Sequence, residues 1–155
     1  MNPTPEKTSV MPPFILMLFL YFIVGLFTVI NQQFQVPLKS ALLPHDGNMT
    51  NALVTLLNFS WFLAYPFSEG FATRWVDRLG YRKTSVYSLL IFIAGLGFYE
   101  AAVLLHIYAP SYITIMGNPI FTGFFIFLSG SFVIGMAVTI LQVVTGLYLD
   151  VNPVG

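Results

Sequence analysis

Long apolar stretches alternate with short polar breaks along the whole chain. Four of these stretches are long enough to cross a bilayer as helices, since a span needs about 20 apolar residues. They cover residues 14–36, 52–72, 84–105 and 120–149. The pattern predicts an all-α, polytopic membrane protein, with four transmembrane helices in one bundle over residues 14–150.

The remaining segments are predicted to lie outside the bundle. Residues 1–13 contain several prolines and are expected to form a tail, and residues 151–155 to form a truncated end. Three loops are predicted to join the spans, at residues 38–51, 73–83 and 106–119. The first apolar run is too long for the core of a signal peptide, so we expect it to remain as a transmembrane helix.

The composition supports a membrane protein and excludes several other classes. Hydrophobic residues make up 57% of the 155 residues and charged residues only 8%, against roughly 25% charged residues in soluble domains. The chain has no cysteine, which excludes disulfides, thiol catalysis and cysteine-based metal sites. Its net charge is zero, so no nucleic acid partner is expected. The first partner that the composition predicts is the lipid bilayer.

The basic residues predict the orientation in the membrane. Four of the six lie between Arg74 and Lys83, whereas loops 38–51 and 106–119 contain one lysine and no arginine. Basic loops remain on the cytoplasmic side of a membrane. We therefore expect a multi-pass protein of the plasma (inner) membrane, with both termini and the 73–83 loop in the cytoplasm.

Small residues recur at four-residue steps within the spans. Such stripes allow helix backbones to approach closely in lipid, so each stripe predicts a helix–helix contact. The stripes are Ala64, Ser68 and Ala72; Gly97 and Ala101; and Ser131, Gly135 and Thr139.

Several amide side chains lie within the predicted spans. Polar groups are costly inside a bilayer unless they are paired, so each is a candidate site residue. Asn31 and Gln32 lie in the outer part of the first span, and Gln142 lies in the inner half of the fourth. Each amide could bind a solute or hydrogen-bond to a neighbouring helix, and the sequence leaves both readings open.

The second span carries an amide and two aromatic residues on one helical face. Asn58, Trp61 and Tyr65 are spaced at i, i+3 and i+7. Amides pair with hydroxyl groups, and flat rings cover the apolar face of a sugar. The spacing is compatible with a sugar site, and equally with simple helix packing by the two rings.

Two carboxylates are candidate proton carriers. At about 1.5 Å per residue, Glu100 falls near the outer boundary of the third span, and Glu69 falls near the inner boundary of the second. A carboxyl group shielded from water holds its proton more readily. The alternative is that both lie at the membrane surface.

The charged loop is a candidate latch between helix ends. Asp77 and the basic side chains around it could form ion pairs that open during transport, beyond their role in setting topology. Gly80 would permit a tight turn between the helices. The latch residues are Asp77, Arg78, Gly80, Arg82 and Lys83.

The same five residues form the spacing D-R-x-G-x-R-K. This spacing resembles the loop motif between the second and third helices of the major facilitator superfamily. The runs from Asn31 to Leu38 and from Leu141 to Tyr148 are similar to the fucose:proton symporter and glucose/galactose branch. Asn31 and Gln142 match polar positions of that branch, whereas Gln32 stands where the branch has an aspartate.

The resemblance implies a fold and a function. Members have twelve helices in two six-helix halves, with the substrate between the halves near the midplane. This chain would then be an N-terminal fragment, about four of the twelve helices, and its partners would be a sugar-like solute and the remaining helices. The implied function of the full-length parent is secondary active sugar transport by alternating access, with proton coupling as one option.

The sequence contains no arrangement of residues typical of an enzyme, and no cofactor is expected. His45 and His106 lie in predicted outward loops without a nucleophile motif. The alternative to a transporter fragment is a complete four-helix membrane protein, either a scaffold or a small oligomeric exporter. Such a protein would oligomerise through the same small-residue stripes.

Overall fold

The computed structural model describes residues 11–43 and 48–151, and three helices and a β-hairpin account for nearly all of them. Helix α1 is Met11–Leu42, α2 is Asn48–Tyr108 and α3 is Thr122–Val151. Strands β1 (Tyr112–Ile115) and β2 (Asn118–Phe121) join α2 to α3. All three helices are long and apolar enough to cross a membrane.

The prediction of four separate helices is wrong in its count. The second and third predicted spans are two arms of α2, which runs for 61 residues and bends at Gly80. We call residues 48–79 the first arm and residues 81–108 the second arm. Gly80 has φ 77° and ψ 167°, a conformation that side-chain-bearing residues essentially never adopt. A tight turn at Gly80 is therefore confirmed, but as one residue within a helix and not as a loop over residues 73–83.

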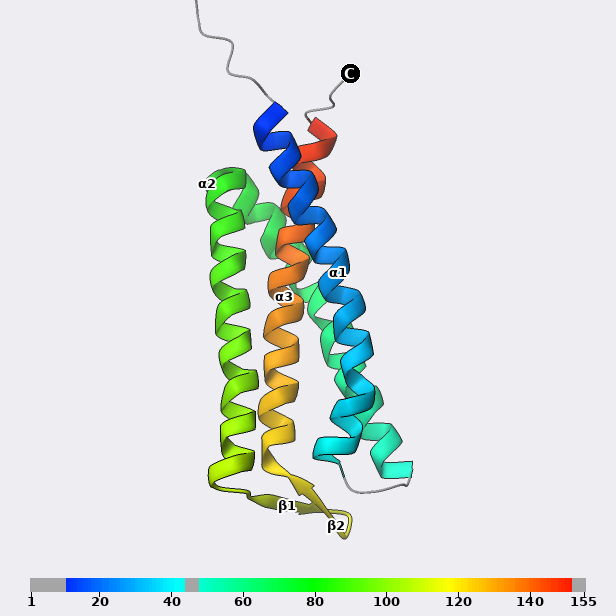
Figure 1. Cartoon of the computed structure of the whole chain (residues 1–155). Coiled ribbons are helices and arrows are strands. Elements are labelled where there is room, and N and C mark those ends of the chain that lie inside the picture. Colours follow the sequence, from blue (N-terminus) through cyan, green and yellow to red (C-terminus); the bar gives the residue numbers. More distant parts are fainter. Residues whose placement is uncertain (1–10, 44–47, 152–155) are drawn as a thin grey trace, which may run out of the picture.

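The elements run up and down through a narrow bundle (Figure 1). The start of α1, the bend in α2 and the end of α3 lie at one end, and the hairpin lies at the other. This arrangement agrees with the expectation that both ends of the chain and the basic segment share one side. Which side of a membrane that is stays a prediction.

The segment boundaries differ from the predicted ones. Helix α1 begins at Met11, inside the expected tail, since prolines are tolerated in the first turn of a helix. It also continues past Pro37 to Leu42. Residues 1–10, 44–47 and 152–155 lie outside the described residues, so most of the tail, the middle of the first loop and most of the predicted truncated end are not assessed.

The third predicted loop is mostly ordered. Strand β2 covers the end of the expected loop and the start of the fourth span, and β1 pairs antiparallel with it from Tyr112↔Phe121 to Ile115↔Asn118. The two residues between the strands, Met116 and Gly117, both have positive φ. Such a two-residue turn matches the twist of paired strands. The loop predicted over residues 106–119 is thus helical as far as Tyr108 and forms a β-hairpin from Tyr112 onward.

The first arm of α2 packs closely against α3. The predicted stripes on both helices are buried, with Ala64, Ser68 and Ser131 fully inaccessible. A Cβ atom at Gly135 would lie 2.8 Å from the carbonyl oxygen of Trp61. These two stripes are therefore confirmed as a contact between helices, as expected where small residues let backbones approach.

The stripe predicted on the second arm is wrong. Gly97 and Ala101 are both exposed, and nothing lies within 4 Å of a Cβ placed on Gly97. The face that packs on α3 carries small residues at seven-residue steps, namely Ser88, Gly95 and Ala102, and all three are buried. Seven residues are close to two helical turns, so this spacing also keeps to one face.

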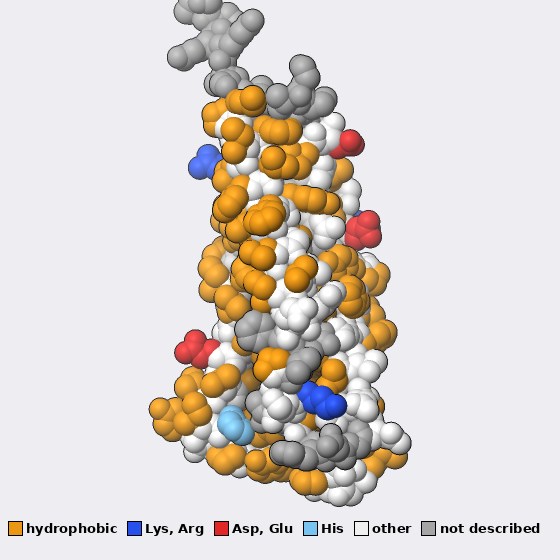
Figure 2. All heavy atoms as spheres, turned by 45° about the vertical axis from the view of Figure 1, so that its right-hand side comes forward, with side chains coloured by type: hydrophobic (Ala, Val, Ile, Leu, Met, Phe, Trp, Pro, Cys, Tyr) orange, Lys and Arg blue, Asp and Glu red, His pale blue; other side chains and the backbone are white. Residues whose placement is uncertain are grey.

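Helix α1 covers the bundle loosely. Among its described side chains only Met17 and Val24 are buried, and they lie seven residues apart. Val24 packs in a cluster with Trp61, Ile134 and other buried residues. Hydrophobic side chains extend along the face shown in Figure 2, with few charged groups among them. Such a surface suits the hydrocarbon of a bilayer.

Candidate functional site

A cavity of about 650 Å³ lies between α1, both arms of α2, and α3. Each helix contributes side chains at helical spacing, so that one face of each helix forms one wall. Eight of the twelve lining residues are purely apolar, and four carry polar atoms. The lining comprises Phe27, Ile30, Asn31, Leu57, Trp61, Phe92, Leu96, Tyr99, Glu100, Val103, Phe127 and Ile134.

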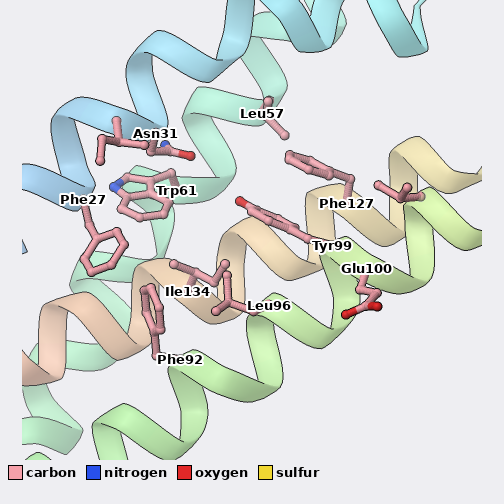
Figure 3. A pocket seen from close by; sticks show the side chains of 12 residues that line it. Phe27, Asn31, Leu57, Trp61, Phe92, Leu96, Tyr99, Glu100, Phe127 and Ile134 are labelled. Atoms are coloured by element: carbon pink, nitrogen blue, oxygen red, sulfur yellow. The ribbon is translucent and has the colours of Figure 1, made fainter.

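The polar corner of the cavity is formed by Asn31 and Trp61. Their side chains lie next to each other across α1 and the first arm (Figure 3). Trp61 is only 2% exposed, and in the described part of the chain its indole N–H has no hydrogen-bond partner. An unpaired buried donor costs about 1–3 kcal/mol. An acceptor that reached this N–H would remove that cost.

The opposite wall is aromatic. The Tyr99 ring stacks on Phe127 at a centroid distance of 3.9 Å, and its hydroxyl group lies 2.8 Å from the Ser131 hydroxyl of α3. Phe27 and Phe92 meet at 4.8 Å between ring centroids, which joins α1 to the second arm. Because Tyr99 already has a partner on α3, its hydroxyl group is held in place at the wall.

The two candidate proton carriers lie in different places. Glu100 lines the cavity but is exposed, and its carboxylate points away from Asn31 and Trp61 (Figure 3). Glu69 is also exposed and is not among the lining residues. Of the two, only Glu100 lines this cavity, and proton transfer by either residue stays a prediction.

The structure brings some of the predicted solute-binding residues together. Asn31 and Trp61 line the cavity, whereas Gln32 is exposed on α1. The other three, Asn58, Tyr65 and Gln142, are half-buried and lie outside the lining. Of the predicted trio on the second span, Trp61 alone faces the cavity, while Tyr65 packs against the cluster that contains Trp61.

Sequence reasoning missed most of the aromatic lining. Phe92, Leu96, Tyr99 and Val103 recur at steps of three or four residues, which places them on one face of the second arm. That spacing was the available signal. It could not be distinguished from the spacing of lipid-facing residues, because phenylalanine is frequent on both kinds of face in this chain.

The candidate latch surrounds the bend in α2. The side chains of Asp77, Arg78, Arg82 and Lys83 are all exposed, and within residues 11–43 and 48–151 the structure shows no ion pair between them. Thr84 donates a hydrogen bond to the carbonyl of Gly80 at 2.9 Å and stabilises the start of the second arm. The charged groups are thus available to other helices or to lipid headgroups, and a latch stays a prediction.

No group of three or more His, Cys, Asp or Glu side chains suited to a metal ion occurs within the described residues. Comparison with known proteins adds no family. No protein-family model matches the chain, and neither curated proteins nor solved structures give a match. The resemblance to the major facilitator superfamily therefore stays a prediction that rests on the sequence motifs alone.

Proposed function

We propose that this chain binds a small solute in the cavity between its helices and belongs to the solute-handling part of a membrane transporter. The observation that carries the proposal is the polar corner formed by Asn31 and the unpartnered Trp61 N–H in a mostly apolar cavity. Ligand sites combine apolar walls with a few placed polar groups in this way. Polar groups within apolar spans also mark substrate pathways more often than other positions do.

The lining favours a solute with one apolar face and a hydrogen-bond acceptor. In this proposal the acceptor meets the amide of Asn31 or the N–H of Trp61, and the more accessible rings of the lining, Phe27 and Phe92, cover the apolar face. A pyranose offers both features, so a sugar is the narrower proposal, with uptake by alternating access in a longer parent protein. In this proposal the bend at Gly80 faces the cytoplasm, and Asp77 with its basic neighbours contacts the helix ends of that parent.

Fluorescence of Trp61 tests binding directly. The chain has two tryptophans, so Trp75→Phe leaves Trp61 as the sole reporter in the purified, detergent-solubilised protein. A panel of hexoses and their aryl glycosides would be titrated. We expect a saturable change in emission for at least one member. In Asn31→Ala the binding should be roughly tenfold weaker in Kd, because the variant loses one hydrogen bond and a tenfold change in Kd corresponds to about 1.4 kcal/mol.

Gln33→Ala is the matched control, because Gln33 is exposed on the same helix and does not line the cavity. Equal effects of the two alanine variants, or no response to any solute, would reject the site. Uptake into vesicles with and without a proton gradient then tests coupling. Glu100→Gln is expected to remove the dependence on the gradient, while Asp150→Asn, at the far end of α3, is expected to retain it.

A further inference from the structure

The β-hairpin is an unusual surface for a helical bundle. It lies across the end of the bundle, crosswise to the helices (Figure 1). Large hydrophobic side chains at and beside its tip are exposed among the described residues. Met116 is 88% exposed and Tyr108, at the adjoining end of α2, is 80% exposed. Ile107, Tyr112, Ile113 and Ile115 are also exposed.

The root of the hairpin is fixed to the bundle. Ile120 is fully buried in a cluster with Leu43, Leu53 and Phe124. Phe121 is also buried, and its ring packs edge-on against the ring of His106 with 4.9 Å between the ring centroids. The backbone N–H of Thr122 donates to the carbonyl of Ser111 at 2.8 Å, which closes the base. The tip is therefore held at a constant level relative to the ends of α2 and α3.

The charge pattern indicates what surrounds the tip. No Lys, Arg, Asp or Glu occurs between Ala101 and Leu149. Sheet edges exposed to water are commonly protected by charged residues, by short strands or by proline, because an apolar edge promotes aggregation. This hairpin has short strands and Pro119 but no charged residue, and it continues directly from two helices whose apolar surfaces suit a bilayer. The layer that those helix ends reach is the boundary between headgroups and acyl chains.

We propose that the tip of the hairpin inserts into the interfacial layer of the bilayer that the helices cross, with lipid as its partner. Ile113, Ile115 and Met116 enter the acyl boundary. Tyr108 and Tyr112 lie at headgroup level, where aromatic rings with a polar end are enriched. The paired strands satisfy part of the backbone, and the remaining edge groups hydrogen-bond to headgroups and interfacial water. The hairpin thereby anchors this end of the bundle at a defined depth.

The experiment uses the absence of cysteine in the chain. Met116→Cys provides a single attachment site for the fluorophore NBD, and the protein is reconstituted into phosphatidylcholine vesicles that contain a nitroxide lipid labelled near the headgroup. Ile93→Cys, at an exposed position in the middle of the second arm, gives the emission expected of a label that faces lipid. Asn48→Cys, exposed at the start of α2, is the aqueous reference. Ile113→Cys repeats the measurement away from the turn, in case substitution at Met116 disturbs it.

We expect the labels at positions 116 and 113 to emit at shorter wavelength than position 48 and to resist quenching by aqueous iodide. They should also be quenched by the headgroup nitroxide more strongly than position 93, which lies deeper in the bilayer. Emission and iodide quenching equal to position 48 would overturn the proposal. Protection from iodide without lipid quenching would also overturn it. If the protection from iodide disappears when the protein is diluted in lipid, the explanation is strand pairing with a second copy. If the protection persists, the explanation is that the chain itself covers the tip.

Discussion

A close contact between α3 and the first arm of α2 gives a sharp test of how these helices pack. Gly135 lies where the two backbones meet, and a Cβ atom at this position would be 2.8 Å from the carbonyl oxygen of Trp61 and 2.9 Å from the Cβ of Ala64. Neither atom can rotate away, since one belongs to the backbone and the other is the first atom of a side chain. Gly135→Ala must therefore push the helices apart.

Two opposing terms set the magnitude. Overpacking of a well-packed contact costs about 1–3 kcal/mol, while alanine in place of glycine favours a helix by about 1 kcal/mol. The expected net loss in the free energy of unfolding is thus about 0–2 kcal/mol. Gly146, also on α3, has no atom within 4 Å of the position that an added Cβ would occupy. Gly146→Ala should therefore have only the effect of higher helix propensity, a gain of about 1 kcal/mol in the free energy of unfolding.

The comparison of the two variants isolates the steric term. Reversible unfolding by SDS in mixed micelles, followed by far-UV circular dichroism, measures each free energy. Gly135→Ala should be less stable than Gly146→Ala by about 1–3 kcal/mol, and Gly135→Val should be less stable still. If Gly135→Ala proved as stable as Gly146→Ala, the close approach of α3 to the first arm would be refuted.

Three further substitutions test separate features by the same unfolding assay or by hydrogen exchange. Gly80→Ala should lose about 1–3 kcal/mol, because only glycine adopts the backbone angles at the bend without strain; retention of full stability would contradict that geometry. Ser131→Ala should lose about 1 kcal/mol through the interhelical hydroxyl contact, and more than Ser129→Ala, whose hydroxyl bonds only within α3. Met116→Gly should stabilise the hairpin by about 1 kcal/mol by relieving a positive φ, seen as slower amide exchange in both strands; unchanged exchange would argue against the turn.

The helical spans could be predicted from the sequence because length and hydropathy alone determine them. The stripes at Ala64–Ser68–Ala72 and Ser131–Gly135–Thr139 were predictable for the same reason, since a four-residue step fixes one helix face. On the second arm two stripes of small residues compete. Nothing local distinguishes Gly97 and Ala101, which are exposed, from Gly95 and Ala102, which pack against α3, because the choice depends on where α3 lies.

Local sequence signals could not predict the hairpin or the number of helices. A two-residue turn with positive φ usually carries Asn-Gly or Asp-Gly, whereas this one carries Met116-Gly117. The sequence from Asp77 to Lys83 is polar enough to resemble a loop, yet it stays helical on both sides of Gly80.

The site was predictable in part. Asn31 and Trp61 were identifiable as polar groups within apolar spans. Their aromatic neighbours, such as Phe92 and Tyr99, required knowledge of which helix faces meet.

Gly80, the single non-helical residue in α2, also determines which face of the second arm is turned toward α3. Ser88, Gly95 and Ala102 meet α3 only because a set number of residues separates them from Gly80. Each residue advances a helix by about 100°. Deleting one residue between Gly80 and Ser88 would therefore rotate these three small residues by a quarter-turn or more, away from α3 and toward lipid. An insertion of about seven residues into the native chain, close to two full turns, would instead leave this face directed toward α3. Length changes beside the bend are therefore constrained in steps of helical turns, in addition to the constraints on substitution at Gly80 and at the buried Thr84.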